Sequence, residues 1–279
     1  MNKPASKRKS STVILEIALF IVAALIVFPI ILLFITTFKE AKDLYNPFSI
    51  PNFGNFENYI KVFKTVNVPL AFGNTIIITV STIVINILIS SMAGYAISRS
   101  KEKAIKLLFF YFVFGLIIPF QSSMIITFKL GMTLHLINTR TFLILQYIAG
   151  GCAYAIMLYV GFTKNIPKEL EEAASIDGYG PFSIFFKIVF PLLRPATLTL
   201  ATITVFWYWN DFSGPLIYLN DKAKSTIMYS IFMFQLDQRS TAVGPVYTLC
   251  FLSIIPVFLF FIIAQKYLVE GLVAGAVKG

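Results

Sequence analysis

Long hydrophobic runs separated by short polar segments dominate the chain. A helix that crosses a bilayer needs roughly 20 mainly apolar residues, because the hydrocarbon layer is about 30 Å thick and each helical residue rises about 1.5 Å. Six runs meet this requirement, at residues 17–37, 72–96, 105–128, 141–162, 196–219 and 247–265. The pattern therefore predicts an all-α integral membrane protein with six transmembrane helices.

The polar segments predict the division of the chain and its orientation. We expect a cytoplasmic N-terminal segment at residues 1–16, a six-helix transmembrane domain at 17–265 with a loop at 163–195, and a cytoplasmic tail at 266–279. A basic cluster of Lys3, Lys7, Arg8 and Lys9 precedes the first run, and most of the 23 Lys and Arg residues fall on the same side as this cluster. The positive-inside rule then places both termini in the cytoplasm.

Composition excludes several other classes of protein. The chain is 57% apolar and 13% charged, which a water-soluble globule of this length does not match. The net charge of +10 is spread over short segments between the runs, so a nucleic-acid partner is not expected. Cys152 and Cys250 lie in different predicted helices, and His135 has no metal-ligating neighbour at usable spacing. We expect neither a disulfide nor a metal site.

The segment 163–195 contains start and stop signals for two short helices. Asn165 and Pro167 favour a helix start, and acidic residues at 169, 171 and 172 suit the positive end of a helix dipole. Gly178 predicts the end of this helix, because glycine readily takes the left-handed conformation. Gly180 and Pro181 open a second helix, which we expect to run to Pro191.

Four residues of the first short helix recur at helical spacing: Leu170, Ala173, Ala174 and Asp177. The two alanines leave a narrow surface that another protein can approach closely. The alternative is an interfacial helix that lies under the bundle without a partner. Spacing alone does not separate these two interpretations.

A longer motif in the same segment favours the first interpretation. Glu172-Ala173-Ala174 is followed after three residues by Gly178, and after nine more by Ile188-x-Phe190-Pro191. This pattern resembles the E-A-A loop of binding-protein-dependent ABC importer permeases, with Phe190 in place of the usual leucine and Tyr179-Gly180 in place of a small pair. The wider match, which includes Trp209-Asn210-Asp211-Phe212 and the C-terminal residues from Gln265 to Gly279, is similar to the carbohydrate branch and to the six-helix permeases of the maltose-transporter kind.

The resemblance implies a multi-subunit importer in a bacterial cell membrane. In that family two homologous permease subunits form the pore, two ATPase subunits grip their cytoplasmic loops, and an external solute-binding protein delivers the sugar. The residues that would couple this chain to an ATPase are Glu172, Ala173, Ala174, Asp177, Gly178, Ile188 and Pro191. The tail residues that would reach the ATPase dimer are Gly275, Lys278 and Gly279. ATP and Mg²⁺ would be held by the ATPase chains, so no cofactor and no catalytic residue is expected here.

An independent observation supports this division of labour. A phosphate-binding P-loop needs Gly-Lys followed by Ser or Thr, and the chain contains no Gly-Lys dipeptide. The energy for transport must therefore come from another chain or from an ion gradient.

The fifth predicted helix carries the candidate solute pathway. Ionisable groups inside a membrane span are unfavourable, so Asp211 needs a partner or a watery cavity. Trp207, Asp211 and Gly214 would share one helical face, with Asn210 beside them, and sugars bind through aromatic stacking and hydrogen bonds. The commoner interpretation is an interfacial tryptophan with Asn210 and Asp211 bonded to a neighbouring helix. Pro119 to Ser123 in the third run likewise predict either a broken, cavity-lining turn or a simple kink.

Two other functions remain open at this point. One is a self-sufficient secondary transporter or channel with Asp211 as its ion or proton site, although such transporters commonly carry inverted repeats and none is visible here. The other is an ABC permease for a solute that is not a sugar.

Overall fold

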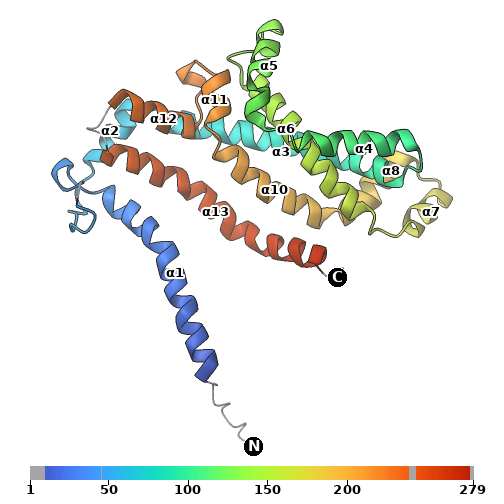
Figure 1. The fold of residues 1–279 in the computed structure, drawn as a ribbon, viewed down its shortest axis with the longest axis horizontal. Helices are drawn as coiled ribbons and strands as arrows, with labels where there is room; N and C mark the ends of the chain where they lie inside the picture. The colour runs from blue at the N-terminus through green and yellow to red at the C-terminus, as the bar shows by residue number, and fades with distance from the viewer. Residues whose placement is uncertain (1–9, 45, 239–242, 277–279) are drawn as a thin grey trace, which may run out of the picture. The chain divides into compact units, whose positions relative to one another are not determined.

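The computed structural model describes residues 10–44, 46–238 and 243–276, and the regular structure in these ranges is helical (Figure 1). The α-helices are α1 (Ser10–Thr36), α2 (Glu57–Thr65), α3 (Val68–Arg99), α4 (Lys103–Gly115), α5 (Phe120–Thr133), α6 (Arg140–Thr163), α7 (Glu169–Ile176), α8 (Pro181–Ile184), α9 (Phe190–Leu192), α10 (Arg194–Trp209), α11 (Ser213–Tyr218), α12 (Ile227–Gln238) and α13 (Val243–Ala276). Two short 3₁₀ helices are η1 (Ala41–Asp43) and η3 (Lys222–Lys224), and η2 (Phe185–Val189) is a π-helix. The basic cluster Lys3, Lys7, Arg8 and Lys9 lies outside the described residues.

The chain forms two compact units. The first contains Met1–Val66 and Met233–Ser253, and the second contains Asn67–Phe232 and Ile254–Gly279. The boundaries between the units fall just before α3, inside α12 and inside α13. The candidate residues that the structure describes belong to the second unit.

The predicted membrane helices are present, but two of them are broken. Four helices are long and apolar enough to cross a membrane alone: Thr12–Thr36, Val68–Arg99, Arg140–Thr163 and Val243–Gln265. Two bent pairs pass the same test together, α4 with α5 at 103° and the segment Pro181–Leu192 with α10 at 70°. The all-α membrane fold is confirmed, and the described residues contain six spans if each bent pair crosses once.

The continuous helix expected at residues 105–128 is the first correction. Helix α4 ends at Gly115, and α5 starts at Phe120 after an extended Pro119. Proline has no backbone N–H and restricts the residue before it to extended conformations, so a helix cannot continue through this point without strain. The run is therefore broken at this point, and not merely kinked.

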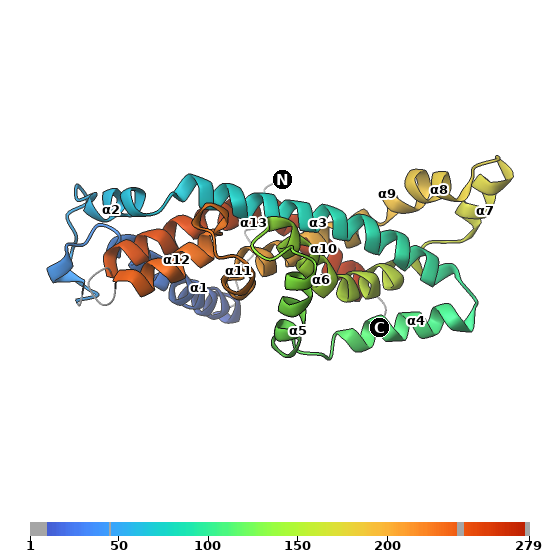
Figure 2. The same ribbon diagram turned by 90° about the horizontal axis from the view of Figure 1, so that it is seen from above.

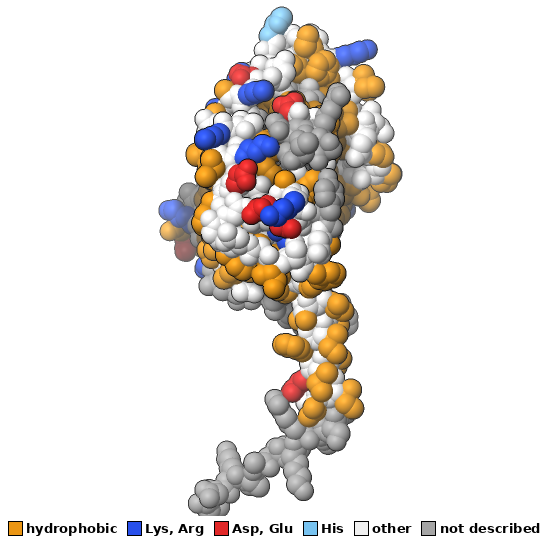
Figure 3. All heavy atoms as spheres, turned by 90° about the vertical axis from the view of Figure 1, so that its left-hand side faces the viewer, with side chains coloured by type: hydrophobic (Ala, Val, Ile, Leu, Met, Phe, Trp, Pro, Cys, Tyr) orange, Lys and Arg blue, Asp and Glu red, His pale blue; other side chains and the backbone are white. Residues whose placement is uncertain are grey.

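Helix α1 presents an apolar surface along its length. None of the most hydrophobic stretch of Thr12–Thr36 is buried within the chain, and hydrophobic side chains make up much of the visible surface of α1 in Figure 3. Phe20 is 76% exposed and Ile26 is 67% exposed. A surface of this kind is stable in the hydrocarbon layer of a bilayer and not in water.

A buried lysine and a buried asparagine fix the segment that follows α1. Asn58 of α2 donates from Nδ2 to the carbonyl oxygens of Thr37 and Lys39, both at 2.9 Å. The ammonium group of Lys39 donates to the carbonyl oxygens of Asn46 and Pro47, at 2.7 and 2.9 Å. These partners compensate the burial of Lys39, which would otherwise be strongly unfavourable. Helix α2 is therefore attached to the end of α1.

Helices α3, α6 and α10 pack together in the second unit (Figure 2). Without a hydrophobic driving force between helices in lipid, close packing depends on small residues and on polar contacts. A Cβ atom placed on Gly94 of α3 would lie 2.6 Å from Cβ of Tyr159 and 3.2 Å from its backbone carbon. Glycine is therefore required at this contact between α3 and α6.

The role of Gly94 can be tested by one added methyl group. Gly94→Ala is expected to destabilise the protein by about 1–3 kcal/mol, because overpacking at a backbone contact forces the helices apart. The measurement is the thermal unfolding midpoint of the purified protein in detergent. Gly73→Ala is the matched control on α3, since a Cβ there meets nothing within 4 Å. It should leave the midpoint unchanged or raise it, and an equal fall in both variants would contradict the packing argument.

Candidate functional site

The loop 163–195 folds into the two short helices that the sequence predicts. Helix α7 carries Glu169, Glu171 and Glu172 in its first turn, where the partial positive charge of the helix end favours them. Gly178 has a φ of 85°, and the N–H of Tyr179 donates to the carbonyl oxygen of Ala174 at 3.0 Å. This left-handed turn with its backward hydrogen bond is a common helix end. The predicted stop at Gly178 is confirmed.

The start of α7 differs from the prediction. Asn165 and Pro167 lie before the helix, which begins at Glu169. The N–H groups of Asn165 and Ile166 still donate to carbonyl oxygens of α6, at Phe162 and Thr163. The chain therefore finishes α6 before it can start α7, and Asn165 does not take the capping position.

The second short helix continues through a π-helix that the sequence does not predict. Gly180 precedes α8 and Pro181 is its first residue, as expected. The chain then passes through η2 into α9, which ends at Leu192 before the 70° bend into α10. Phe185 and Val189 of η2 are buried, at 3% and 0% exposure. π-Helical turns are rare in proteins, and those that occur are often found at functional sites.

One side of α7 and α8 packs on the bundle and the other is open. Ala174 and Ile184 are buried with Tyr159 of α6 and Leu193 in one apolar cluster. The open side presents apolar side chains of Leu170, Ile176, Tyr179 and Phe182, and Ile176 is 87% exposed. Among the candidate coupling residues, Ala174 is buried and Ile188 is partly buried, and the exposed ones are Glu172, Ala173, Asp177, Gly178 and Pro191.

Two residues of α3 contact this loop although the loop pattern does not predict them. Tyr95 donates a hydrogen bond to the carboxylate of Glu171 at 2.8 Å, and Arg99 forms a salt bridge with the same carboxylate. The contacts join positions more than 70 residues apart in sequence, so no local signal along the chain suggests them.

The helical face expected at Trp207, Asp211 and Gly214 is the second correction. Helix α10 ends at Trp209, and α11 starts at Ser213. Asp211 accepts hydrogen bonds from the N–H groups of Ser213 at 2.9 Å and Gly214 at 3.0 Å, so its carboxylate binds the start of α11 and the residue does not continue α10. Acidic side chains at this position compete with helix continuation because they satisfy free backbone donors.

Asp211 also binds a neighbouring helix. The hydroxyl of Tyr147 on α6 donates to Oδ2 of Asp211 at 2.7 Å, and the ring of Tyr147 stacks on Tyr208 with centroids 4.9 Å apart. Gly214 is buried beneath this carboxylate, since a Cβ there would lie 2.6 Å from Oδ2. The carboxylate therefore has the partners that an ionisable group within a membrane protein requires.

Trp207 and Asn210 lie apart from this hydrogen-bonded group. Trp207 is 48% exposed, and its ring contacts Tyr154 of α6 with centroids 5.2 Å apart. The side-chain amide of Asn210 donates to the carbonyl oxygen of Phe206 at 2.9 Å, and the residue is exposed. Exposed aromatic and amide groups are therefore available next to the end of α10.

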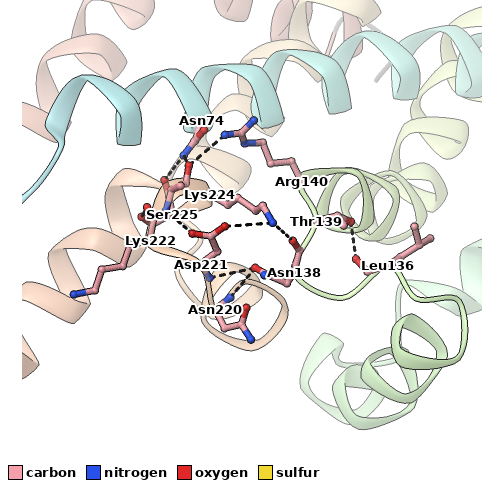
Figure 4. Close-up of polar contacts among 11 residues, drawn as sticks. Asn74, Leu136, Asn138, Thr139, Arg140, Asn220, Asp221, Lys222, Lys224 and Ser225 are labelled. Carbon is pink, nitrogen blue, oxygen red and sulfur yellow. Dashed lines mark hydrogen bonds and ion pairs between the residues drawn. The ribbon is translucent and has the colours of Figure 1, made fainter.

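Polar contacts join the loop before α6 to the loop after α11 (Figure 4). Oδ1 of Asn138, a residue with a φ of 62°, accepts from the N–H groups of Asn220 and Asp221 at 3.2 Å. Lys224 donates to the carbonyl oxygen of Asn138 at 2.8 Å. The hydrogen bond from the N–H of Ala223 lowers the pKa of Asp221, and Lys224 lowers it to a smaller extent. The carboxylate of Asp221 therefore stays ionised at neutral pH.

The loop after α11 is also attached to α3 and to the start of α6. Nδ2 of Asn74 donates to the carbonyl oxygens of Ala223 at 3.0 Å and Ser225 at 2.9 Å, and Arg140 at the start of α6 donates to Ala223 at 3.2 Å. The starts of α3 and α6 thus share one acceptor, and α3 and α6 run in the same direction.

Asn138 is the residue that this loop contact depends on most directly. Asn138→Ala removes the acceptor of two backbone N–H groups and places a Cβ-bearing residue of lower left-handed preference at a positive φ. We expect faster hydrogen–deuterium exchange in residues 218–224, measured by mass spectrometry. Asn220→Ala is the control, because Asn220 contributes its backbone N–H, which the substitution retains. Equal exchange in both variants would show that the side chain of Asn138 does not hold the loop.

Of the three candidate tail residues, Gly275 belongs to the described part of the chain. Gly275 lies in α13, which continues to Ala276, beyond the expected end of the last span at residue 265. Lys278 and Gly279 lie outside the described residues. Within the described ranges, Cys152 and Cys250 are free thiols and no group of metal-ligating side chains is present.

A family model and two related proteins each match most of the chain. A family model described as "Binding-protein-dependent transport system inner membrane component" matches residues 86–273, which include the loop 163–195. The probable starch degradation products transport system permease protein AmyC of Thermoanaerobacterium thermosulfurigenes is 36% identical over 251 residues, covering 90% of this chain and 91% of that protein. The melibiose/raffinose/stachyose import permease protein MelC of Bacillus subtilis is 31% identical over 276 residues, covering 99% of each chain.

A solved structure has the same fold. A chain of a bacterial ABC transporter involved in the import of the acidic polysaccharide alginate superimposes with a TM-score of 0.77 at 22% identity, covering 95% of this chain and 99% of that one. The shared fold therefore extends over nearly the whole of both chains.

Proposed function

Because the chain belongs to the family of binding-protein-dependent transport system inner membrane components, we propose that it forms part of the pathway through which an ABC importer moves oligosaccharides. It is a multi-pass inner-membrane permease subunit, not an enzyme, and the family has no cofactor of its own. The proposed substrate class rests on the relatives, which are named for starch degradation products and for melibiose, raffinose and stachyose.

The proposed complex contains this chain, a second homologous permease, two ATPase subunits that hold ATP and Mg²⁺, and an external sugar-binding protein. Both termini of this chain and the loop 163–195 face the bacterial cytoplasm. Glu172, Ala173, Asp177 and Gly178 contact a cleft of the ATPase, with Ala174, Ile188 and Pro191 shaping the loop behind them. The tail residues Gly275, Lys278 and Gly279 reach towards the ATPase dimer.

The observation that carries the proposal is the open apolar side of α7 and α8. Leu170, Ile176 and Phe182 are 45%, 87% and 69% exposed at a helix pair whose other side packs on the bundle. Exposed large apolar side chains gathered on one segment commonly mark a protein interface. ATP binding then moves α7, and the bundle turns its cavity from one side of the membrane to the other.

The pathway residues that we propose are Trp207, Asn210, Asp211 and Gly214. The half-exposed ring of Trp207 and the exposed Asn210 offer the stacking and hydrogen bonding that sugars use, while Asp211 and Gly214 shape the break beside them. A self-sufficient transporter with Asp211 as its ion site is not favoured, because Tyr147 and two backbone N–H groups already occupy this carboxylate.

A bulky substitution at Ala173 tests the coupling role. In membrane vesicles that contain the complete transporter, Ala173→Trp is expected to lower sugar uptake by about tenfold or more, because one misfitted side chain at an interface commonly costs over 1.4 kcal/mol. ATP hydrolysis should persist without transport. Ala173→Ser is the matched control and should transport normally, while both variants should reach the membrane in equal amounts. Normal uptake by Ala173→Trp would contradict the proposal.

A further inference from the structure

The C-terminal end of α3 holds the start of α7 through one carboxylate. Arg99 donates from Nε at 2.8 Å and from Nη2 at 2.5 Å to Oε1 of Glu171. Tyr95 donates to Oε2 at 2.8 Å, so both oxygens of Glu171 are engaged. Nη2 of Arg99 also donates to the carbonyl oxygen of Ile166 at 2.8 Å. These four residues, Tyr95, Arg99, Ile166 and Glu171, form the Glu171 cluster.

The burial of the ion pair determines its strength. The side chains of Arg99 and Glu171 are 15% and 13% exposed. Ion pairs at an exposed surface contribute little, because water screens the charges and the side chains lose conformational freedom. In a largely buried pair with additional hydrogen bonds, removal of one partner leaves the other charge uncompensated, which is strongly unfavourable. The contact between Arg99 and Glu171 is therefore difficult to separate.

Both charges also suit the helices that carry them. Arg99 is the last residue of α3, where the helix dipole is negative, and Glu171 lies in the first turn of α7, where it is positive. The salt bridge therefore joins the C-terminal end of one helix to the N-terminal end of the other, and each helix favours its own partner.

Apolar packing gives α7 little additional attachment. Ala174 is the one buried residue of α7, at 4% exposure. The ring of Tyr95 meanwhile packs against Phe185 of η2 with centroids 5.5 Å apart. The Glu171 cluster thus provides the specific polar contact between α7 and the long helix α3.

We propose that the Glu171 cluster makes α3 and α7 move as one body during transport, with Arg99 as the positioning residue. The proposal rests on the proposed function, because an ATPase must act on the loop 163–195 to move α7. Force applied to α7 then reaches α3 directly, as well as through the chain that leads into α10.

Separate measurements of ATP hydrolysis and sugar uptake test this role in the complete reconstituted transporter. Arg99→Gln and Glu171→Gln are each expected to raise the ATP hydrolysed per sugar by about tenfold, since each leaves an unpaired buried partner. Tyr95→Phe should raise it less. Lys101→Gln is the control, because it removes one positive charge from an exposed position two residues beyond Arg99. An unchanged ratio in Arg99→Gln and Glu171→Gln would overturn the proposal.

Charge exchange separates a specific pairing from general damage. The double variant with Arg99→Glu and Glu171→Arg restores the attraction between the two side chains but opposes both helix dipoles. It should therefore recover part of the coupling that is lost in Arg99→Glu alone or in Glu171→Arg alone. A double variant no better than the worse single variant would count against a direct pairing.

A distance measurement tests the common movement of α3 and α7 itself. A purely structural role of Arg99 would not make the distance between these helices depend on nucleotide. Spin labels at Ala96→Cys on α3 and Ser175→Cys on α7 use two exposed positions in a background with Cys152→Ser and Cys250→Ser. We expect the same distance in the nucleotide-free and ATP-bound complexes, and a nucleotide-dependent distance once Arg99→Gln is added. A distance that changes on ATP binding with Arg99 intact would overturn the proposal.

The two proposals fail in different ways. If Ala173→Trp transports normally, the ATPase does not act at this loop and the proposed function fails. If Ala173→Trp uncouples transport while Arg99→Gln and Glu171→Gln retain the normal ratio, the function stands and the role of the Glu171 cluster fails.

Discussion

The close approach of α3 and α6 at Gly94 is the contact on which the arrangement of the second unit depends. A glycine at this position brings the backbone of α3 next to Tyr159, and no larger residue could do so without moving a helix. Because lipid offers no hydrophobic drive for helix association, such steric fit is decisive. It aligns α3 so that Asn74 at one end contacts the loop after α11, and Arg99 at the other end contacts Glu171.

Hydropathy predicts the existence of the membrane helices because it measures the transfer of side chains into an apolar medium. It does not measure whether the backbone continues through a run. At Pro119 a missing N–H and a steric restriction divide one expected span into α4 and α5. At Asp211 a carboxylate that accepts two backbone N–H groups divides another. Each break is caused by one residue. The local effect of that residue on the backbone outweighs the tendency of the surrounding apolar run to form one helix.

The loop 163–195 is predicted better than the contacts that hold it. Its acidic first turn and the stop at Gly178 depend on neighbours along the chain, so the sequence specifies them. The π-helix η2 and the pairing of Arg99 with Glu171 depend on residues brought together by α3 and α6 packing. Local signals therefore identify which segment is specialised, while its mechanical connection becomes visible only in three dimensions.

The break at residues 210–212 has a further consequence. The run from 196 to 219 is apolar enough to favour one uninterrupted helix, yet the carboxylate of Asp211 stabilises the interrupted form by binding Ser213 and Gly214 and by receiving the hydroxyl of Tyr147. The interruption therefore depends on the hydrogen bonds of one polar side chain and not on the hydrophobic pattern around it. A single carboxylate thus determines where the backbone of a largely apolar run changes direction.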